Sequence, residues 1–209
     1  MKIKFMIAPK YPPESTVLSF SNLCDPRIAS TLSLPLSGQL VKSQCLVVTG
    51  PNGSGKTTFL TMLAMINKPQ SGYVEAQPLF YCGHQTGLKP SWTVKQNLDF
   101  RLRVYSCSVA TSFEEMLTRF KLEKYLRTPL GHLSRGQQQQ IALISGLLSP
   151  YGLWILDEPF AHLDQHAQTM WQLLMDNHCQ EGGALVYSTH TGHKGFLQNK
   201  LSLDLSSVT

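Results

Sequence analysis

The chain has 209 residues, which suits one domain, because a single core usually stops growing only beyond about 250 residues. Its 42% apolar and 15% charged residues are typical of a folded globular protein. The net charge of +5 comes from dispersed lysines and arginines, so we expect no nucleic-acid partner. No window approaches the roughly 18 uninterrupted apolar residues of a spanning helix, and the five scattered cysteines lack the C-x-x-C spacing of a zinc site.

The first part of the chain, up to about residue 40, mixes proline, serine and leucine with short apolar pieces and predicts irregular strands. Two lysines precede a few apolar residues at the very start, but Pro9 and Lys10 interrupt them before they reach the length of a signal-peptide core. We therefore expect a protein that is not secreted, and the odd number of cysteines favours a reducing compartment.

The next segment reads as strand, loop and helix. An apolar, partly β-branched run from Cys45 to Thr49 predicts the strand, and Leu60 and Leu63 stand at helical spacing within a helix expected from Thr57 to Ile66. The loop between them fits G-x-x-x-x-G-K-[ST], the P-loop pattern; its residues are Gly50, Pro51, Asn52, Gly53, Ser54, Gly55, Lys56 and Thr57, followed by Thr58.

A loop of this kind binds the phosphates of ATP. Its glycines let successive backbone N–H groups turn towards phosphate oxygens, and the following helix adds unpaired N–H groups and partial positive charge. Lys56 is then expected to reach the β- and γ-phosphates, and Thr57 to ligate Mg²⁺.

Further along the chain, three short apolar runs predict buried strands, and about fifty mostly helical residues follow the first of them. The runs are Leu79–Cys82, Leu153–Leu156 and Ala184–Tyr187. Runs that are apolar throughout are typical of parallel strands covered on both faces, and their alternation with helices predicts an α/β fold.

Asp157 and Glu158 follow the second of these runs directly. Phosphoryl transfer needs a carboxylate to hold the metal and a group to position water, and adjacent side chains on a strand point in opposite directions. Asp157 is therefore the expected Mg²⁺ ligand and Glu158 the expected general base. Standing alone, the pair would be read as a solvated acidic turn before Pro159.

A helix start precedes this acidic pair. Ser134 and Gln137 have the spacing of a capping box, and an apolar stretch from Ile141 to Leu148 follows. The segment Leu133–Gln137 reads LSRGQ, and its place between the P-loop and Asp157 resembles the LSGGQ signature of the ATP-binding cassette (ABC) ATPases.

The resemblance covers nearly the whole chain with the motifs in order. Gln85 matches the glutamine of the Q-loop, Leu153 to Asp157 the Walker B strand, and Glu158 the catalytic glutamate; the residues 161–164 match the D-loop and His190 the switch histidine. It implies a P-loop NTPase of the ABC type, with a mostly parallel core sheet, antiparallel N-terminal strands and a helical subdomain at about residues 88–150 of a single nucleotide-binding domain, 1–209.

The resemblance also implies how the site works. Two copies form a head-to-tail dimer, in which ATP on the P-loop of one copy is covered by Ser134, Gly136 and Gln137 of the other. Gln85 would sense Mg²⁺ and the coupling helices of membrane subunits, and His190 would contact the γ-phosphate. ATP favours the closed dimer because only that state makes both sets of phosphate contacts.

Within this family, two strings resemble the ATP-binding subunits of the heme exporters of cytochrome c maturation, the CcmA family: residues 81–89 with Val94, Asn97 and Leu98, and residues 153–160. This implies membrane subunits of the CcmB and CcmC type, and work tied to release of the heme chaperone CcmE. It places the protein peripherally on the cytoplasmic face of the inner membrane, or on the matrix side in a mitochondrion. No C-x-x-C-H is present for heme attachment, and Cys82 and His84 are read as loop packing.

The chain departs from the family pattern at two places. Arg135 replaces a small residue of the signature, and no aromatic residue stands near Leu23 to Asp25, where the family stacks adenine. The changed signature predicts slow turnover, and the missing aromatic residue leaves the preference for a nucleotide base open. Three alternatives remain: the ATP-binding subunit of another ABC transporter, an ABC ATPase of DNA repair or chromosomes, and a P-loop kinase.

Overall fold

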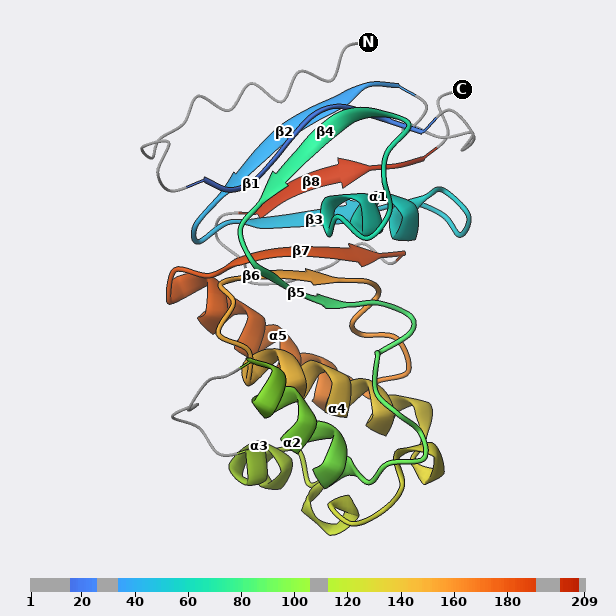
Figure 1. The fold of residues 1–209 in the computed structure, drawn as a ribbon, viewed down its shortest axis with the longest axis vertical. Helices are drawn as coiled ribbons and strands as arrows, with labels where there is room; N and C mark the ends of the chain where they lie inside the picture. The colour runs from blue at the N-terminus through green and yellow to red at the C-terminus, as the bar shows by residue number, and fades with distance from the viewer. Residues whose placement is uncertain (1–15, 26–33, 106–112, 191–199, 207–209) are drawn as a thin grey trace.

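The structure, a computed structural model, describes residues 16–25, 34–105, 113–190 and 200–206. Within them, two sheets and a group of helices are stacked along the long axis of the molecule (Figure 1). No helix in these ranges is both long and apolar enough to cross a membrane.

The central sheet has five strands in the order β5-β6-β7-β3-β8, and all four strand pairs are parallel. Its strands are β3 (Cys45–Thr49), β5 (Leu79–Cys82), β6 (Leu153–Leu156), β7 (Ala184–Thr189) and β8 (Lys200–Asp204). Because the strands run in one direction, their carboxyl ends meet at one edge, and the P-loop, Asp157 and His190 follow three of these ends.

A second sheet of three antiparallel strands packs on one side of the first. Its order is β2-β1-β4, formed by β1 (Thr16–Cys24), β2 (Leu36–Val41) and β4 (Ser71–Ala76). The helix α1 (Lys56–Leu63) lies between the two sheets (Figure 1), where it buries Phe59, Leu60 and Leu63.

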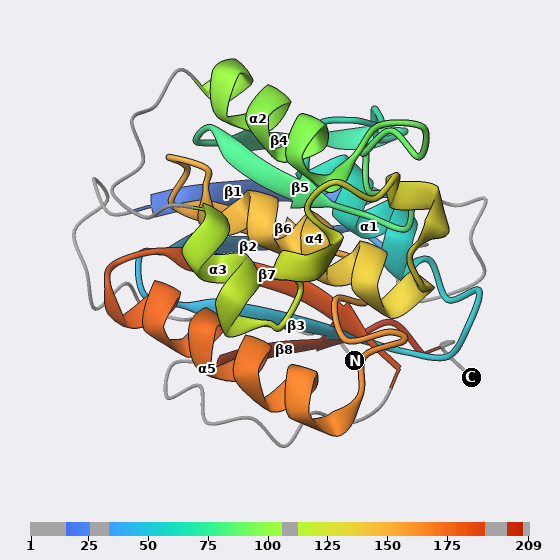
Figure 2. The same cartoon turned by 90° about the horizontal axis from the view of Figure 1, so that it is seen from below.

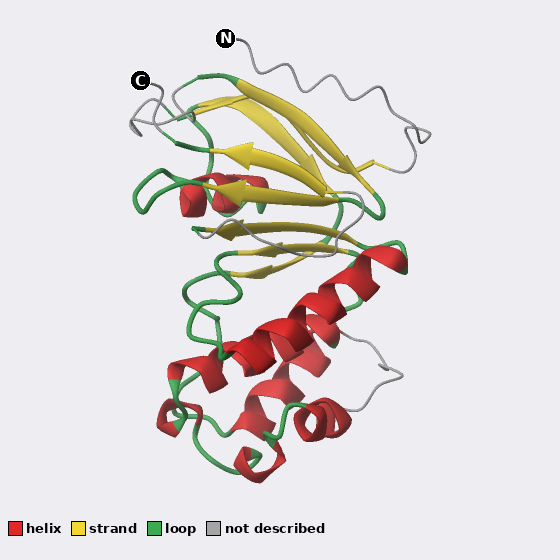
Figure 3. Ribbon diagram, turned by 180° about the vertical axis from the view of Figure 1, so that it is seen from behind, coloured by secondary structure: helices red, strands yellow, loops and turns green. Residues whose placement is uncertain are grey.

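The remaining helices cover the other face of the parallel sheet (Figures 2 and 3). They are α2 (Val94–Tyr105), α3 (Phe113–Arg119), α4 (Arg135–Leu147) and α5 (Gln165–Gln180), with short 3-10 turns η3 (Glu123–Tyr125) and η4 (Leu130–His132). The sheet thus separates two apolar cores. Alternating residues of one strand serve both: Leu153 and Ile155 face α1, whereas Trp154 and Leu156 face the helices.

The predicted α/β fold with a mostly parallel sheet and antiparallel N-terminal strands is confirmed. The strands expected up to about residue 40 are present as β1 and β2, and their pairing is irregular, because its register shifts between Thr16 and Leu18 and again between Phe20 and Leu23. Residues 1–15 and 26–33, with the expected interruption at Pro9 and Lys10, and Cys107 lie outside the described residues.

The helix expected from Thr57 to Ile66 is shorter than predicted, because it ends at Leu63. Met65 has a left-handed backbone with a φ of 56°, and the amides of Ile66 and Asn67 both donate to the carbonyl of Thr61. These turn contacts replace the next helical turn and lead the chain into β4.

Candidate functional site

The P-loop connects β3 to α1 in a conformation that depends on glycine. Gly53 and Gly55 have φ values of 81° and 91°, which side chains other than glycine rarely adopt. At Gly50, a Cβ atom would lie 2.5 Å from Ser54 Oγ. Ser54 Oγ is itself buried and has no hydrogen-bond partner among the described residues, so the loop holds a polar group that an oxygen of a bound phosphate would satisfy.

Lys56 is folded into this loop with only 6% of its surface exposed. Its Nζ donates to the carbonyls of Gly50 at 2.9 Å and Pro51 at 3.0 Å. Around it, Pro51, Asn52 and Gly53 are exposed, whereas Thr58 is half-buried in the first turn of α1. The ammonium group therefore lies inside the loop, next to the backbone that would surround phosphates.

Thr57 and Asp157 are joined across the sheet edge. Thr57 Oγ1 donates to Asp157 Oδ2 at 2.6 Å, and Ser188 Oγ donates to Asp157 Oδ1 at 2.5 Å. A threonine hydroxyl and an aspartate carboxylate are both oxygen ligands of the kind that Mg²⁺ binds. The donor set thus fits the metal that phosphoryl transfer uses.

Glu158 lies at the centre of the cluster. Its Oε1 is 3.7 Å from Lys56 Nζ, and its Oε2 is 3.1 Å from His190 Nδ1. The backbone N–H of Glu158 donates to Ser188 Oγ at 2.8 Å. Three sequence-predicted residues that are far apart in the chain, Lys56, Glu158 and His190, are therefore in contact.

Ser188 was missed as a site residue by the sequence reasoning. Its hydroxyl touches both carboxylate residues, and the residue itself is fully buried in β7. The available indication was its position near the carboxyl end of a strand, two residues before His190.

Gln85 lies in the loop after β5 and is exposed. Its neighbours His84 and Thr86 line a pocket of about 190 Å³ together with Asp157 and Glu158. Gln85 thus stands near the carboxylates without lining this pocket. Burial raises the pKa of the neighbouring Cys82 thiol to about 12, which favours the predicted packing role over ligation.

The signature segment begins α4. Ser134 is the N-cap: its hydroxyl accepts from the amide of Gln137 at 3.3 Å, and its own amide donates to Gln137 Oε1 at 2.9 Å, which confirms the predicted capping box. Gly136 lies so close to the carbonyl of His162 that a side chain would collide with it. This contact joins the start of α4 to the D-loop.

Residues of the signature face two different pockets. Ser134, Gly136 and Gln137 line one of about 450 Å³ that contains no residue of the P-loop, whereas Arg135 lines the smaller pocket with Asp157 and Glu158. Within one chain, Ser134 and Arg135 thus line different pockets, and Arg135 shares its pocket with both carboxylates.

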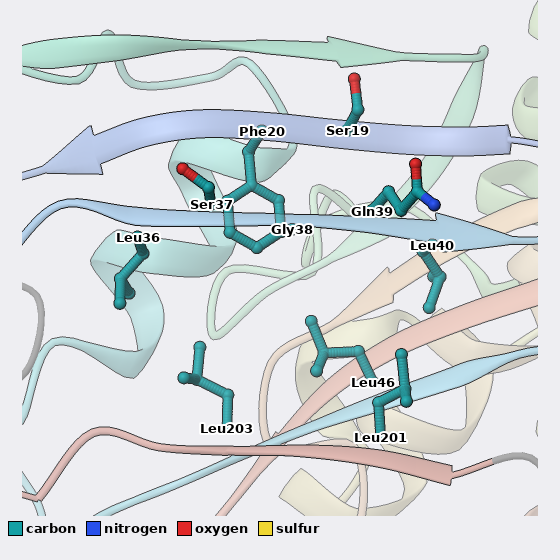
Figure 4. Close-up of a pocket in the computed structure, with 10 residues that line it drawn as sticks. All are labelled: Ser19, Phe20, Leu36, Ser37, Gly38, Gln39, Leu40, Leu46, Leu201 and Leu203. Atoms are coloured by element: carbon teal, nitrogen blue, oxygen red, sulfur yellow. The ribbon is translucent and has the colours of Figure 1, made fainter. Parts of the chain in front are cut away.

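A third pocket lies between the two sheets (Figure 4). It has about 290 Å³ and is lined mainly by apolar side chains of β1, β2, β3 and β8, among them Phe20, Leu40, Leu46 and Leu203. None of the predicted site residues lines it, so it is separate from the phosphate loop.

Comparison with known proteins agrees with this geometry. The family model for ABC transporters matches residues 34–161. The cytochrome c biogenesis ATP-binding export protein CcmA of Brucella abortus is 33% identical over 183 residues, covering 83% of this chain and 85% of that protein. The protein of the same name from Rhizobium etli is 34% identical over 188 residues, covering 83% of this chain and 87% of its own.

Solved structures show the same fold. An ABC transporter of the metal-chelate type, in an inward-facing conformation, aligns with a TM-score of 0.66 and 26% identity over 85% of this chain and 74% of its own. A dimeric ATP-binding cassette in a post-hydrolysis state, bound to ADP and Pi, aligns with a TM-score of 0.67 and 21% identity over 83% of this chain and 88% of its own.

The family model covers more than half of the chain, and the relatives match it over most of their length. Together with the P-loop and its cluster of Thr57, Asp157 and Glu158, they establish an ATPase. The chain belongs to the ATP-binding subunits of ABC transporters and is similar to those of the CcmA type.

Proposed function

We propose that this chain is the ATP-hydrolysing subunit of an ABC exporter that serves cytochrome c biogenesis. The observation that carries the proposal is the 33% identity to a cytochrome c biogenesis ATP-binding export protein across 83% of the chain. By its resemblance to the heme exporters, the work concerns heme export and the release of the heme chaperone CcmE.

The chemistry follows from the cluster around Glu158. Its carboxylate takes the proton of the attacking water, and such a base is typically worth about 10² to 10⁴ in rate. His190, at 3.1 Å from Glu158, orients this carboxylate and contacts the γ-phosphate. Lys56 balances the phosphate charge, and it must leave its present contact with Glu158 when it does so.

Thr57, Asp157 and Gln85 would hold Mg²⁺. When bound, the ion neutralises charge on the β- and γ-phosphate oxygens. Ser188 keeps Asp157 oriented through its hydroxyl, and Gln85 lies in an exposed loop from which it can report the state of the site to a membrane subunit.

The complete site needs two copies of the chain. Gly50–Thr58 of one copy bind the triphosphate, and Ser134, Gly136 and Gln137 of the other copy cover it. Within one chain, the pocket lined by Ser134, Gly136 and Gln137 contains no residue of the P-loop, which supports this arrangement. Each copy would be one nucleotide-binding domain, with a helical subdomain at about residues 88–150 and with membrane subunits of the CcmB and CcmC type as partners.

In this proposal the protein lies peripherally at the cytoplasmic face of an inner membrane, or at the matrix side in a mitochondrion. Purification of the tagged chain from membranes of its own host tests the assignment. We expect CcmB- and CcmC-type subunits to co-purify, together with the heme chaperone CcmE when Glu158→Gln traps the complex. Recovery of the membrane subunit of another transporter instead would assign the chain to that transporter.

A further inference from the structure

The pocket next to the signature serine carries an excess of positive charge. Among the side chains that line its 450 Å³ are Arg119, Lys121 and Lys124, and the one carboxylate is Asp164. One carboxylate oxygen of Asp164 already has a hydrogen-bond partner, because its Oδ1 accepts from the amide of Ala167 at 2.8 Å and caps α5. In the described part of the chain, none of the three cations has a carboxylate within ion-pair distance.

The three cations lie around a defined turn at the end of α3: Arg119 is the last residue of that helix, Lys121 lies in the turn, and Lys124 lies in η3. The amide of Lys121 donates to Thr118 at 3.0 Å, and that of Leu122 donates to Leu117 at 2.7 Å, which is the Schellman pattern of a helix end. Lys121 has a left-handed backbone with a φ of 56°, at the position of this motif where glycine is usual. A lysine here is less favourable than glycine, because its Cβ is close to the following carbonyl oxygen.

Aromatic contacts fix the same turn. Phe120 stacks on Trp171 of α5 with ring centroids 4.7 Å apart, and Lys124 Nζ lies 5.1 Å from the ring of Tyr125. Like charges around one pocket repel each other, and an anion that enters the pocket relieves this repulsion. The turn is therefore built to hold cations around a site for an anion.

We propose that Arg119, Lys121 and Lys124 bind the phosphates of ATP held on the P-loop of a second copy, and so set how tightly the two copies close. This inference rests on the proposed function, because Ser134 in the same pocket is the residue expected to meet that nucleotide. The ligand is thus a nucleoside triphosphate presented by another protomer, and binding depends steeply on salt.

The test uses Glu158→Gln as the parent, with its ATP-dependent dimerisation followed by sedimentation. Adding Lys121→Gln and Lys124→Gln is expected to raise the dimer Kd about tenfold, since an exposed charge pair is typically worth a factor of roughly two to five. The affinity of the dilute monomer for a fluorescent ATP analogue is expected to stay unchanged, because Lys121 and Lys124 lie outside the P-loop.

Lys68→Gln with Arg127→Gln is the matched control, since both residues are exposed, neither lines the pocket and the same charge is lost. It is expected to shift the Kd by less than about twofold. Equal dimerisation of the Lys121/Lys124 variant and the parent would overturn the inference, as would weaker ATP binding by its monomer. A parent that does not dimerise with ATP at all would instead remove the proposed two-copy site.

Discussion

Glu158 has a backbone conformation that is uncommon for a residue with a side chain. Its φ of 48° is left-handed, and a hydrogen bond from its amide to Ser188 Oγ holds it there. Strain of this kind persists only where neighbouring contacts over-determine it, and it is concentrated at functional sites. Ser188 supplies that contact and also orients Asp157, so one hydroxyl positions both carboxylates.

Replacement of Ser188 by alanine tests whether its hydroxyl positions the two carboxylates. We expect ATPase activity to fall at least about tenfold with ATP affinity nearly unchanged, because the P-loop is intact while the base loses its positioning contact. Loss of two hydrogen bonds at a buried site is expected to lower the free energy of unfolding by about 1–3 kcal/mol. Steady-state hydrolysis and urea unfolding measure the two effects.

Ser149→Ala is the control for that variant, because the Ser149 hydroxyl is buried without a hydrogen-bond partner among the described residues. Its removal is expected to leave activity unchanged. Full activity of Ser188→Ala would show that the carboxylates are positioned without the β7 hydroxyl.

At the scale of elements, α5 is joined to the sheet by a half-buried imidazole. His178 stacks on Trp154 of β6 with ring centroids 3.9 Å apart, and its Nε2 lies 2.9 Å from the carbonyl of Gly152. Gly183 lies directly against the ring, so that no side chain fits there. Burial lowers the pKa of His178 below its usual 6.5.

This contact predicts a pH-dependent stability. In the unfolded chain the imidazole takes up a proton near its usual pKa of 6.5, whereas the folded chain takes it up only at lower pH. The stabilisation is thus complete above the unfolded pKa and is lost as the pH falls towards the folded one. We expect the free energy of unfolding to drop between about pH 7.5 and about pH 5.5.

His178→Phe keeps an aromatic ring on Trp154 and removes the titrating group. It is expected to be less stable than the wild type at neutral pH, because the hydrogen bond to Gly152 is lost, but with a smaller decrease on acidification. Urea unfolding at both pH values measures the difference. An equal decrease in both proteins would contradict the assignment of this pH dependence to His178.

Elements whose burial is uniform could be predicted from the sequence. β3 and β6 have the predicted bounds, because strands covered on both faces are apolar along their whole length. The edge strand β5 also has the predicted bounds, because its half-buried residues Leu79 and Tyr81 are apolar as well. β4 and β8 were not predicted: Ser71–Ala76 mixes exposed and half-buried residues, and Lys200–Asp204 buries only Leu203 fully. Their pairing depends on partners distant in the sequence, Thr16–Cys24 for β4 and Cys45–Thr49 for β8.

The site shows the same division. Lys56, Thr57, Asp157 and Glu158 could be found from spacing, because their chemistry requires fixed positions after strands. The contacts of Ser188 and the placement of Ser134 and Arg135 in different pockets depend on packing across the sheet and around α4, which local sequence does not encode.

At the scale of the whole molecule, the two halves of the site point to different places on one chain. The P-loop cluster gathers at the carboxyl edge of the parallel sheet, and Ser134 opens onto a separate pocket on the helical side. In the proposed two-copy site, ATP that contacts both halves at once would join two copies, and this contact would make nucleotide binding favour the closed dimer. In this proposal, hydrolysis would then remove the nucleotide contact that joins the copies.

The most direct measurement of this claim is the molar mass of Glu158→Gln in solution with and without ATP. The substitution keeps the shape of the side chain and removes the base, so we expect ATP to be retained unhydrolysed and the mass to double. Ser134→Arg, combined with it, is expected to bind ATP as a monomer. A Glu158→Gln protein that stays monomeric at saturating ATP, or that hydrolyses ATP at the wild-type rate, would contradict the two-copy site.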